Sequence, residues 1–175
     1  MLVKRTKSLV KNILLNTVAP SSLFSPKIRV YIYKTLGIKI NKSYIFHGCF
    51  FGGNNVKIGE NSFINCRCFF DNTEAIEIGE NCQMGMEVMF ITSTHEIGKP
   101  ERRAGSAIGK PIKVGNGCWV CARATILPGV TIGDGCIIAA GSVVTKDCLP
   151  NGLYAGVPAK RMKELSLTTD YMQIV

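Results

Sequence analysis

Residues 114–144 read VGNGCW VCARAT ILPGVT IGDGCI IAAGSV V, so an aliphatic residue opens every block of six. Earlier parts of the chain keep this spacing. Their positions are Ile40, Phe46 and Gly52, then Ile58, Ile64 and Phe70, then Ile78, Met84 and Phe90. Of the fifteen positions in the register, only Gly52 is not large and apolar. A repeat this short cannot be a pair of helices and predicts a short strand plus a corner.

Each block has a second inward position two residues earlier, because residues i−2 and i of an extended segment point to the same side. This position is small or mid-sized, and four of the eight cysteines occupy it: Cys68, Cys82, Cys118 and Cys136. We interpret them as compact core residues. The motif Cys118-x-x-Cys121 is then accidental, with Cys121 at a corner. Glycines often follow the aliphatic position, and we expect them to supply the backbone angles of tight corners.

Three blocks close one turn of a parallel β-helix, and stacked turns bury a continuous core. Counting in threes gives about five turns. The register is interrupted between Phe70 and Ile78 and again between Phe90 and Val114. The two excursions, residues 71–75 and 91–111, are expected to leave the prism at the same corner, one turn apart. Loops on a rigid scaffold commonly carry function.

The ends differ from the repeat body, which we assign to residues 37–157. Residues 1–36 are interpreted as a basic helical segment, with one helix over 3–18 and another that begins at Ser25-Pro26 and ends at Gly37. Residues 158–175 are expected to form a short helix over Ala159–Leu165 and a tail. The predicted fold class is all-β.

The positive charge is confined to one segment. The chain has 175 residues and a formal charge of +9, but residues 1–42 hold nine basic and no acidic side chains. The remaining 12 basic and 12 acidic residues balance, which argues against a nucleic-acid surface on the body. The apolar stretch at 12–25 is too short and polar for a membrane span. We expect a cytoplasmic chain; residues 1–25 either contact the inner face of a membrane or form a solvated cap.

Four stretches carry a family resemblance: Ile91–His95, Ile126–Gly133, Ala140–Asp147 and Ala155–Lys160. In these the chain resembles the hexapeptide-repeat acyltransferases, which are left-handed parallel β-helices. It is similar to the maltose and galactoside O-acetyltransferases, and to acetyltransferases of capsule, exopolysaccharide and lipopolysaccharide clusters. The resemblance implies a homotrimer with sites between neighbouring prisms, and acetyl-CoA as the co-substrate.

The resemblance also implies roles for residues on the acceptor side. His95 matches the catalytic histidine, and an imidazole suits the removal of a hydroxyl proton near neutral pH. Glu87 stands where the sugar acetyltransferases have an asparagine, so it either accepts a hydrogen bond from His95 or the sugar, or is solvated. Asp71 matches an acidic residue of the acceptor cleft. Arg102 and Arg103, in the larger excursion, either position an anionic acceptor, close the loop or remain solvated.

On the CoA side, Trp119 matches a residue that lines the pantetheine channel. The small residues Ala122 and Ala140 match positions that meet the pantetheine arm. Three further residues match the phosphate and adenine end, where hydroxyl and ammonium groups suit phosphate: Thr145, Lys146 and Lys160.

These residues predict an acetyl-CoA-dependent O-acetyltransferase acting on a saccharide, free or linked to a nucleotide or lipid, in surface polysaccharide synthesis. N-acetylation of an amino sugar or antibiotic amine remains an alternative. The presence of His95, Trp119 and Lys146 within their motifs argues against a non-enzymatic scaffold. No metal is expected, because a zinc carbonic anhydrase of this fold needs three histidine ligands and the chain has only His47 and His95, 48 residues apart. His47 matches no motif and is taken as structural.

Overall fold

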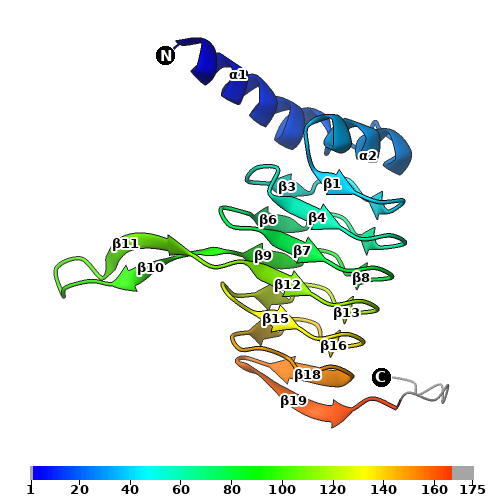
Figure 1. Cartoon of the computed structure of the whole chain (residues 1–175), viewed down its shortest axis with the longest axis vertical. Coiled ribbons are helices and arrows are strands. Elements are labelled where there is room, and N and C mark those ends of the chain that lie inside the picture. Colours follow the sequence, from blue (N-terminus) through cyan, green and yellow to red (C-terminus); the bar gives the residue numbers. More distant parts are fainter. Residues whose placement is uncertain (1, 167–175) are drawn as a thin grey trace.

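The computed structural model describes residues 2–166, with the backbone alone for residues 2–5, 7 and 8. Its body is a prism of three parallel sheets, and the chain passes through one strand of each sheet in every turn (Figure 1). Helices lie at the N-terminal end of the prism, and a hairpin projects from its side. The predicted left-handed parallel β-helix is confirmed, with five complete turns and one strand of a sixth.

We number the sheets in the order in which the chain enters them. Sheet 1 contains β1 (Lys39–Ile40), β4 (Val56–Ile58), β7 (Ile76–Ile78), β12 (Ile112–Val114) and β15 (Thr131–Ile132). Sheet 2 contains β2 (Tyr44–Ile45), β5 (Phe63–Ile64), β8 (Gln83–Met84), β13 (Trp119–Val120), β16 (Ile137–Ile138), β18 (Gly152–Gly156) and β19 (Ala159–Glu164). Sheet 3 contains β3 (Phe50–Phe51), β6 (Phe69–Asp71), β9 (Met89–Ile91), β14 (Thr125–Ile126) and β17 (Val143–Val144). The first corner joins sheets 1 and 2, the second joins sheets 2 and 3, and the third joins sheets 3 and 1.

The aliphatic position of each block points into the prism from the second turn to the fifth. Twelve such residues are at most 4% exposed: Ile58, Ile64, Phe70, Ile78, Met84, Phe90, Val114, Val120, Ile126, Ile132, Ile138 and Val144. Strands that alternate an inward and an outward residue leave the opposite side chains on the surface. The core is therefore one continuous column along the prism axis.

The predicted register is wrong in the first turn. Ile45 and Phe51 are fully buried there, whereas Phe46 is 36% exposed. Parallel pairing gives the reason, since Ile45 lies beside Ile64 and Phe51 beside Phe70. The Phe51 and Phe70 rings stack with their centroids 4.6 Å apart. The one glycine in the predicted register is thus a corner residue and no exception to the pattern.

The small inward position at the first corner is a serine or a cysteine in every turn. Each donates its O–H or S–H to the corner carbonyl of the next turn. The pairs are Ser43–Gly59 at 2.5 Å, Ser62–Gly79 at 2.8 Å, Cys82–Gly115 at 3.0 Å, Cys118–Gly133 at 3.1 Å and Cys136–Leu149 at 3.1 Å. The predicted burial of Cys68, Cys82, Cys118 and Cys136 is confirmed. Their donor groups explain why serine and cysteine share this position.

The expected reason for the glycines that follow the aliphatic position is wrong, because none of them has a left-handed backbone. They are selected by close stacking. A Cβ on Gly59 would lie 2.5 Å from the carbonyl carbon of Gly79, and one on Gly79 would lie 2.8 Å from that of Gly115. Left-handed φ angles occur two residues later, as at Asn61 (+55°) and Asn81 (+56°), which asparagine tolerates better than most residues.

Both excursions leave the third corner, as predicted. The larger one forms an antiparallel hairpin of β10 (Ser93–Ile97) and β11 (Ala104–Gly109), which extends away from the prism (Figure 1). The buried hydroxyl of Thr92 donates to the carbonyl of Asp71 at 2.5 Å and accepts from the amide of Glu74 at 3.1 Å. Thr92 therefore fastens the base of the hairpin to the smaller excursion.

The N-terminal segment contains helices over both predicted stretches. They are α1 (Leu2–Ile13), the π-helix η1 (Leu14–Val18) and α2 (Pro26–Thr35). Ser25 caps α2, and Gly37 follows it with a φ of +97°. Arg29 is buried and donates to the carbonyls of Ala19, Ser21, Phe24 and Ile45 at 2.7–3.0 Å. One guanidinium thus joins the helices to the first turn.

The predicted C-terminal helix over Ala159–Leu165 is wrong. Residues Ala159–Glu164 form β19, which pairs antiparallel with β18. The last strand of a β-helix would otherwise present an open edge, and β19 covers it. The spacing of Arg161 and Glu164 suits a helix and also allows their ion pair here, at 3.7 Å. The rest of the expected tail, residues 167–175, lies outside the described residues.

The first-corner ladder can be tested at Ser62, whose hydroxyl also accepts the amide of Cys82 at 3.0 Å. Ser62→Ala should lower the free energy of unfolding by about 1–3 kcal/mol, because a buried amide and a buried carbonyl lose their partner. Ser62→Cys, which keeps a donor, should cost less. Urea denaturation would measure both, with the exposed Ser106→Ala as control. A loss equal to that of Ser106→Ala would contradict the ladder.

Candidate active site

His95 lies on the projecting hairpin, in β10, opposite Ala107 of β11. Its side chain is exposed. Alternation along a strand places Ser93 and His95 on the same face of the hairpin. The His95–Ala107 pair lies two residue pairs beyond the Ser93–Gly109 pair at the hairpin base. An exposed imidazole at such a position is accessible to a substrate.

Asp71 holds the base of that hairpin. One carboxylate oxygen accepts both the amide of Ser93, at 3.1 Å, and the hydroxyl of Ser93. The other accepts the hydroxyl of Thr73 at 3.2 Å. Desolvation raises the pKa of Asp71, but the hydrogen bonds from Ser93 and Thr73 outweigh it, and the pKa lies below its ordinary value. The structure therefore links Asp71 to the strand of His95 through Ser93, a residue that the sequence analysis missed.

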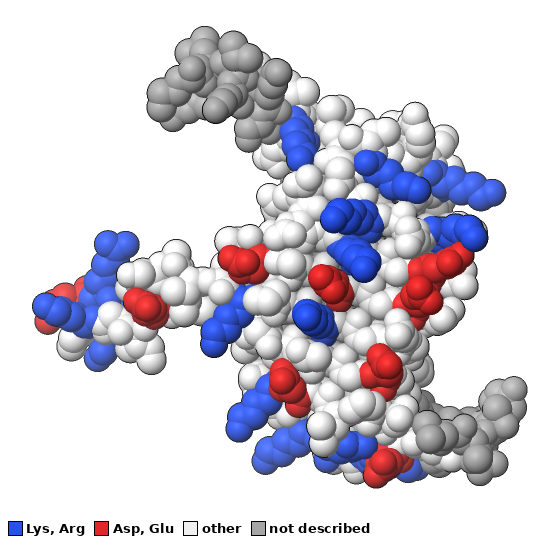
Figure 2. Space-filling model, in the orientation of Figure 1, with Lys and Arg blue, Asp and Glu red and all other residues white. Residues whose placement is uncertain are grey.

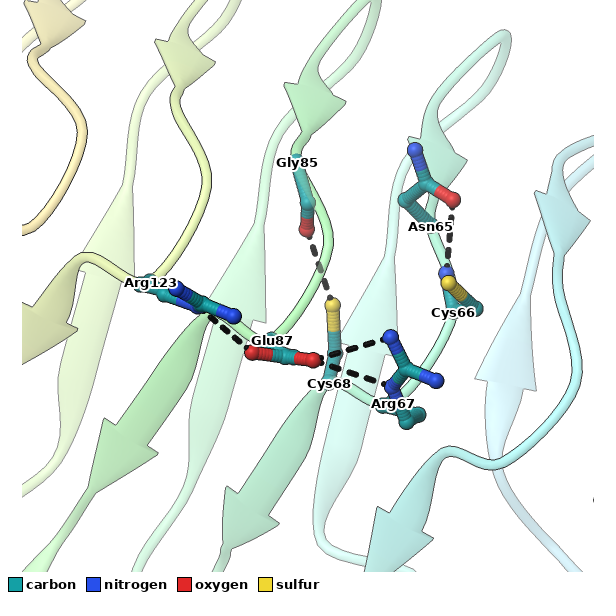
Figure 3. Close-up of polar contacts among 7 residues, drawn as sticks. All are labelled: Asn65, Cys66, Arg67, Cys68, Gly85, Glu87 and Arg123. Carbon is teal, nitrogen blue, oxygen red and sulfur yellow. Dashed lines mark hydrogen bonds and ion pairs between the residues drawn. The ribbon is translucent and has the colours of Figure 1, made fainter.

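Glu87 occupies the second corner and is held between two arginines (Figure 3). Its Oε1 accepts Nε of Arg67 at 3.0 Å and lies 2.9 Å from Nη2 of Arg67, and its Oε2 accepts Nε of Arg123 at 2.7 Å. The hydrogen bond from Arg123, opposed by desolvation and aided by the charges of Arg123 and Arg67, lowers the pKa of Glu87. The carboxylate is therefore ionised at neutral pH.

Glu87 and His95 are separated within one chain. Strand β9 runs from the second corner to the third, so Glu87 precedes it and the hairpin follows it. Among the described residues, the side-chain hydrogen bonds of Glu87 go to Arg67 and Arg123. Both arginines were missed in the sequence, although they share the corner column of Glu87, twenty residues before it and 36 after it.

Arg102 and Arg103 lie at the tip of the hairpin, away from its base. The amide of Gly98 donates to the carbonyl of Arg103 at 2.9 Å and closes the tip. Both arginine side chains are exposed, and basic and acidic side chains gather at this tip (Figure 2). Within one chain the two arginines do not join Asp71.

The residues expected to bind CoA lie on the last turns. Trp119 points outward from sheet 2 and is 45% exposed. Ala122 and Ala140 stack at the second corner, where the amide of Gly141 donates to the carbonyl of Ala122 at 2.9 Å. The two alanines are therefore adjacent, and Trp119 lies in the same turn as Ala122. The others follow β17 or lie on β19, and all are exposed: Thr145, Lys146 and Lys160.

No metal site is present among residues 2–166, since no three His, Cys, Asp or Glu side chains there converge as ligands. The eight cysteines are free. Desolvation raises the pKa of the Cys121 thiol, which disfavours a reactive thiolate. His47 lies at the second corner beside the ring of Phe46.

Comparison with known proteins shows which family shares this fold. A family model described as bacterial transferase hexapeptide (six repeats) matches residues 111–146. The crystal structure of a maltose O-acetyltransferase from Clostridium difficile 630 superposes with a TM-score of 0.81 and 31% identity, covering 94% of this chain and 88% of that one. The chain belongs to the bacterial hexapeptide-repeat transferases.

Two further hexapeptide-repeat proteins are similar. An acetyltransferase from Vibrio cholerae, solved with acetyl-CoA, has a TM-score of 0.77 and 30% identity, covering 93% of this chain and 87% of that one. The galactoside O-acetyltransferase of Escherichia coli K12 is 36% identical over 114 residues, which is 65% of this chain and 56% of that protein. The matched part spans 55–57% of the length of such curated relatives.

Proposed function

We propose that the chain is an acetyl-CoA-dependent O-acetyltransferase that modifies a hydroxyl of a saccharide, with His95 as the general base. The observation that carries this proposal is the exposed His95 on a hairpin whose base Asp71 fastens through Ser93. A second support is the family, in which similar proteins are named for sugar O-acetylation or were solved with acetyl-CoA.

In the proposed reaction the acceptor oxygen attacks the thioester carbonyl carbon while the imidazole of His95 takes the hydroxyl proton. The C–S bond then breaks, and the imidazolium returns the proton to the leaving sulfur, so the products are an acetyl ester and the CoA thiol. A sugar hydroxyl is almost wholly protonated at neutral pH, which is why a base near the attacking oxygen accelerates the step. The ionised Asp71 maintains the hairpin geometry.

The CoA side fits the last turns of the prism. Alanine at 122 and 140 leaves the corner backbone open to a narrow pantetheine arm, and Trp119 offers an apolar wall beside it. Thr145, Lys146 and Lys160 supply hydroxyl and ammonium groups that would bind the phosphates of CoA.

The surface of the prism supports a homotrimer. The outward column of sheet 1 is charged, with Lys57, Glu77 and Lys113 side by side, and it faces the viewer in Figure 2. The outward columns of sheets 2 and 3 instead expose Tyr44, Phe50, Met89 and Trp119. Apolar faces of this kind are covered in oligomers. Packing copies along sheets 2 and 3 would bring His95 of one copy towards the second corner of another.

The acceptor is proposed to be a component of a surface polysaccharide, free or linked to a nucleotide or lipid. The names of the similar proteins support a sugar, and the choice among surface polysaccharides rests on the resemblance of the motifs.

The base assignment predicts that His95→Ala lowers the turnover number by about 10²–10⁴-fold, the range for loss of a general base. Thiol release from acetyl-CoA, measured with free, nucleotide-linked and lipid-linked sugars, would test it. The matched control is His47→Ala, which should retain wild-type turnover. Near wild-type release by His95→Ala would refute the assignment.

The N-terminal segment is proposed to contact an anionic membrane surface. Leu9, Val10 and Ile13 are exposed on α1, within a segment that carries nine basic and no acidic residues. No helix among the described residues has the length and apolar character to cross a bilayer. A basic helix with an apolar face binds at the interface instead. This placement would present the enzyme to a lipid-linked acceptor.

Vesicle co-sedimentation would test the membrane contact. The full chain should sediment with vesicles that contain phosphatidylglycerol and should not sediment with phosphatidylcholine alone. The double variant Leu9→Glu, Ile13→Glu should lose binding, because two apolar side chains that would enter the membrane interface become charged. Ile97→Glu removes an even more exposed apolar residue from the hairpin and should bind as the wild type does. Equal sedimentation of the double variant and the wild type would exclude the contact.

A further inference from the structure

We propose that Arg67 and Arg123, held in place by Glu87, form an anion-binding site that selects an acceptor with a carboxylate or phosphate near the acetylated hydroxyl. This inference rests on the proposed function, and it names the chemical class of the acceptor. The two arginines would be specificity residues, and Glu87 a positioning residue. Figure 3 shows Glu87 between Arg67 and Arg123.

The three residues occupy successive turns at the second corner. Their φ angles are +58° at Arg67, +60° at Glu87 and +60° at Arg123, so their backbones superpose along the prism axis. The carboxylate lies between the two guanidinium groups and contacts both at 2.7–3.0 Å. One negative charge between two positive ones leaves the corner with a net charge of +1.

Most of the arginine donors remain available. A guanidinium carries five N–H groups in a planar fork. Arg67 directs its Nε and Nη2 to one oxygen of Glu87, and Arg123 directs its Nε to the other. Within the described residues, the hydrogen bonds of these guanidinium groups go to Glu87 alone, and the side chains are 62% and 75% exposed. The free edges suit the planar or tetrahedral oxygens of an anion.

Stability does not explain the column. Exposed ion pairs contribute little to folding, and a left-handed backbone favours glycine over residues with a side chain. Glycine does occupy this column at Gly48 and Gly141, where φ is +75° and +69°. The long charged side chains at the three positions between these glycines therefore indicate a binding function on the surface of the corner.

The column lies beside the proposed acetyl donor. Arg123 directly follows Ala122, one of the two small residues proposed to meet the pantetheine arm. A Cβ on Gly85, in the turn of Glu87, would lie 2.5 Å from the amide nitrogen of Ala122, so the two turns are in close contact here. The unpaired guanidinium N–H groups of Arg67 and Arg123 therefore lie beside the place where the acceptor would meet the thioester.

Two pairs of acceptors would test the inference with the full-length enzyme. One compares p-nitrophenyl β-D-glucuronide with p-nitrophenyl β-D-glucoside, and the other compares glucose 1-phosphate with glucose; together they separate carboxylate from phosphate. Calorimetric binding and CoA release would be measured for wild type, Arg67→Gln, Arg123→Gln and the matched charge control Lys57→Gln on sheet 1. Thermal melting would confirm that each variant is folded.

For at least one pair, the wild type should prefer the charged compound by roughly tenfold in KM, as expected for charge-assisted hydrogen bonds. Each arginine variant should lose that preference through a higher KM for the charged compound, and Lys57→Gln should keep it. Equal affinity for charged and neutral compounds, or an unchanged preference in both arginine variants, would overturn the inference. Anion binding that both arginine variants lose, without any CoA release, would support the anion site and count against the proposed acetyl transfer.

Discussion

Successive turns of the prism are separated by one strand spacing, about 4.8 Å, and this distance constrains every other feature. A residue at a given place in one turn lies directly against its counterpart in the next. Glycines stack where any Cβ would meet the backbone of the following turn, as Gly59 does with Gly79. Serine and cysteine recur where a small donor must reach the next corner carbonyl. Phenylalanine rings stack in the core for the same reason.

The same constraint decides where function can be placed. A turn that must superpose on its neighbours leaves room for extra residues only at a corner, and both excursions use the third one. Thr92 and Asp71 fasten the hairpin to the prism there, so His95 projects from a rigid base. The second corner has no inserted loop. Its surface is distinguished instead by the charged side chains of Arg67, Glu87 and Arg123. Within one chain the two features lie at opposite ends of β9.

The sequence predicted the fold because the aliphatic spacing gives the length of one strand and one corner, and three such blocks complete a turn. It predicted the wrong register around Ile45 and Phe51, since a corner of different length in the first turn is visible only once β2 pairs with β5. It mistook β19 for a helix because closure of an edge depends on a neighbouring strand. The partners of Glu87 were missed for a similar reason: Arg67 and Arg123 are 56 residues apart and meet Glu87 only through the winding of the helix.

The central proposal is that a functional site needs His95 from one copy and the second corner from another. Subunit mixing tests it most directly. Two inactive variants, His95→Ala and Ala122→Trp (which would block the pantetheine arm), would be unfolded, mixed in equal amounts and refolded together. Random assembly into trimers should restore about a quarter of wild-type CoA release, because one interface in four would receive both intact parts. If mixed trimers form and release no more CoA than the separate variants, the claim is wrong.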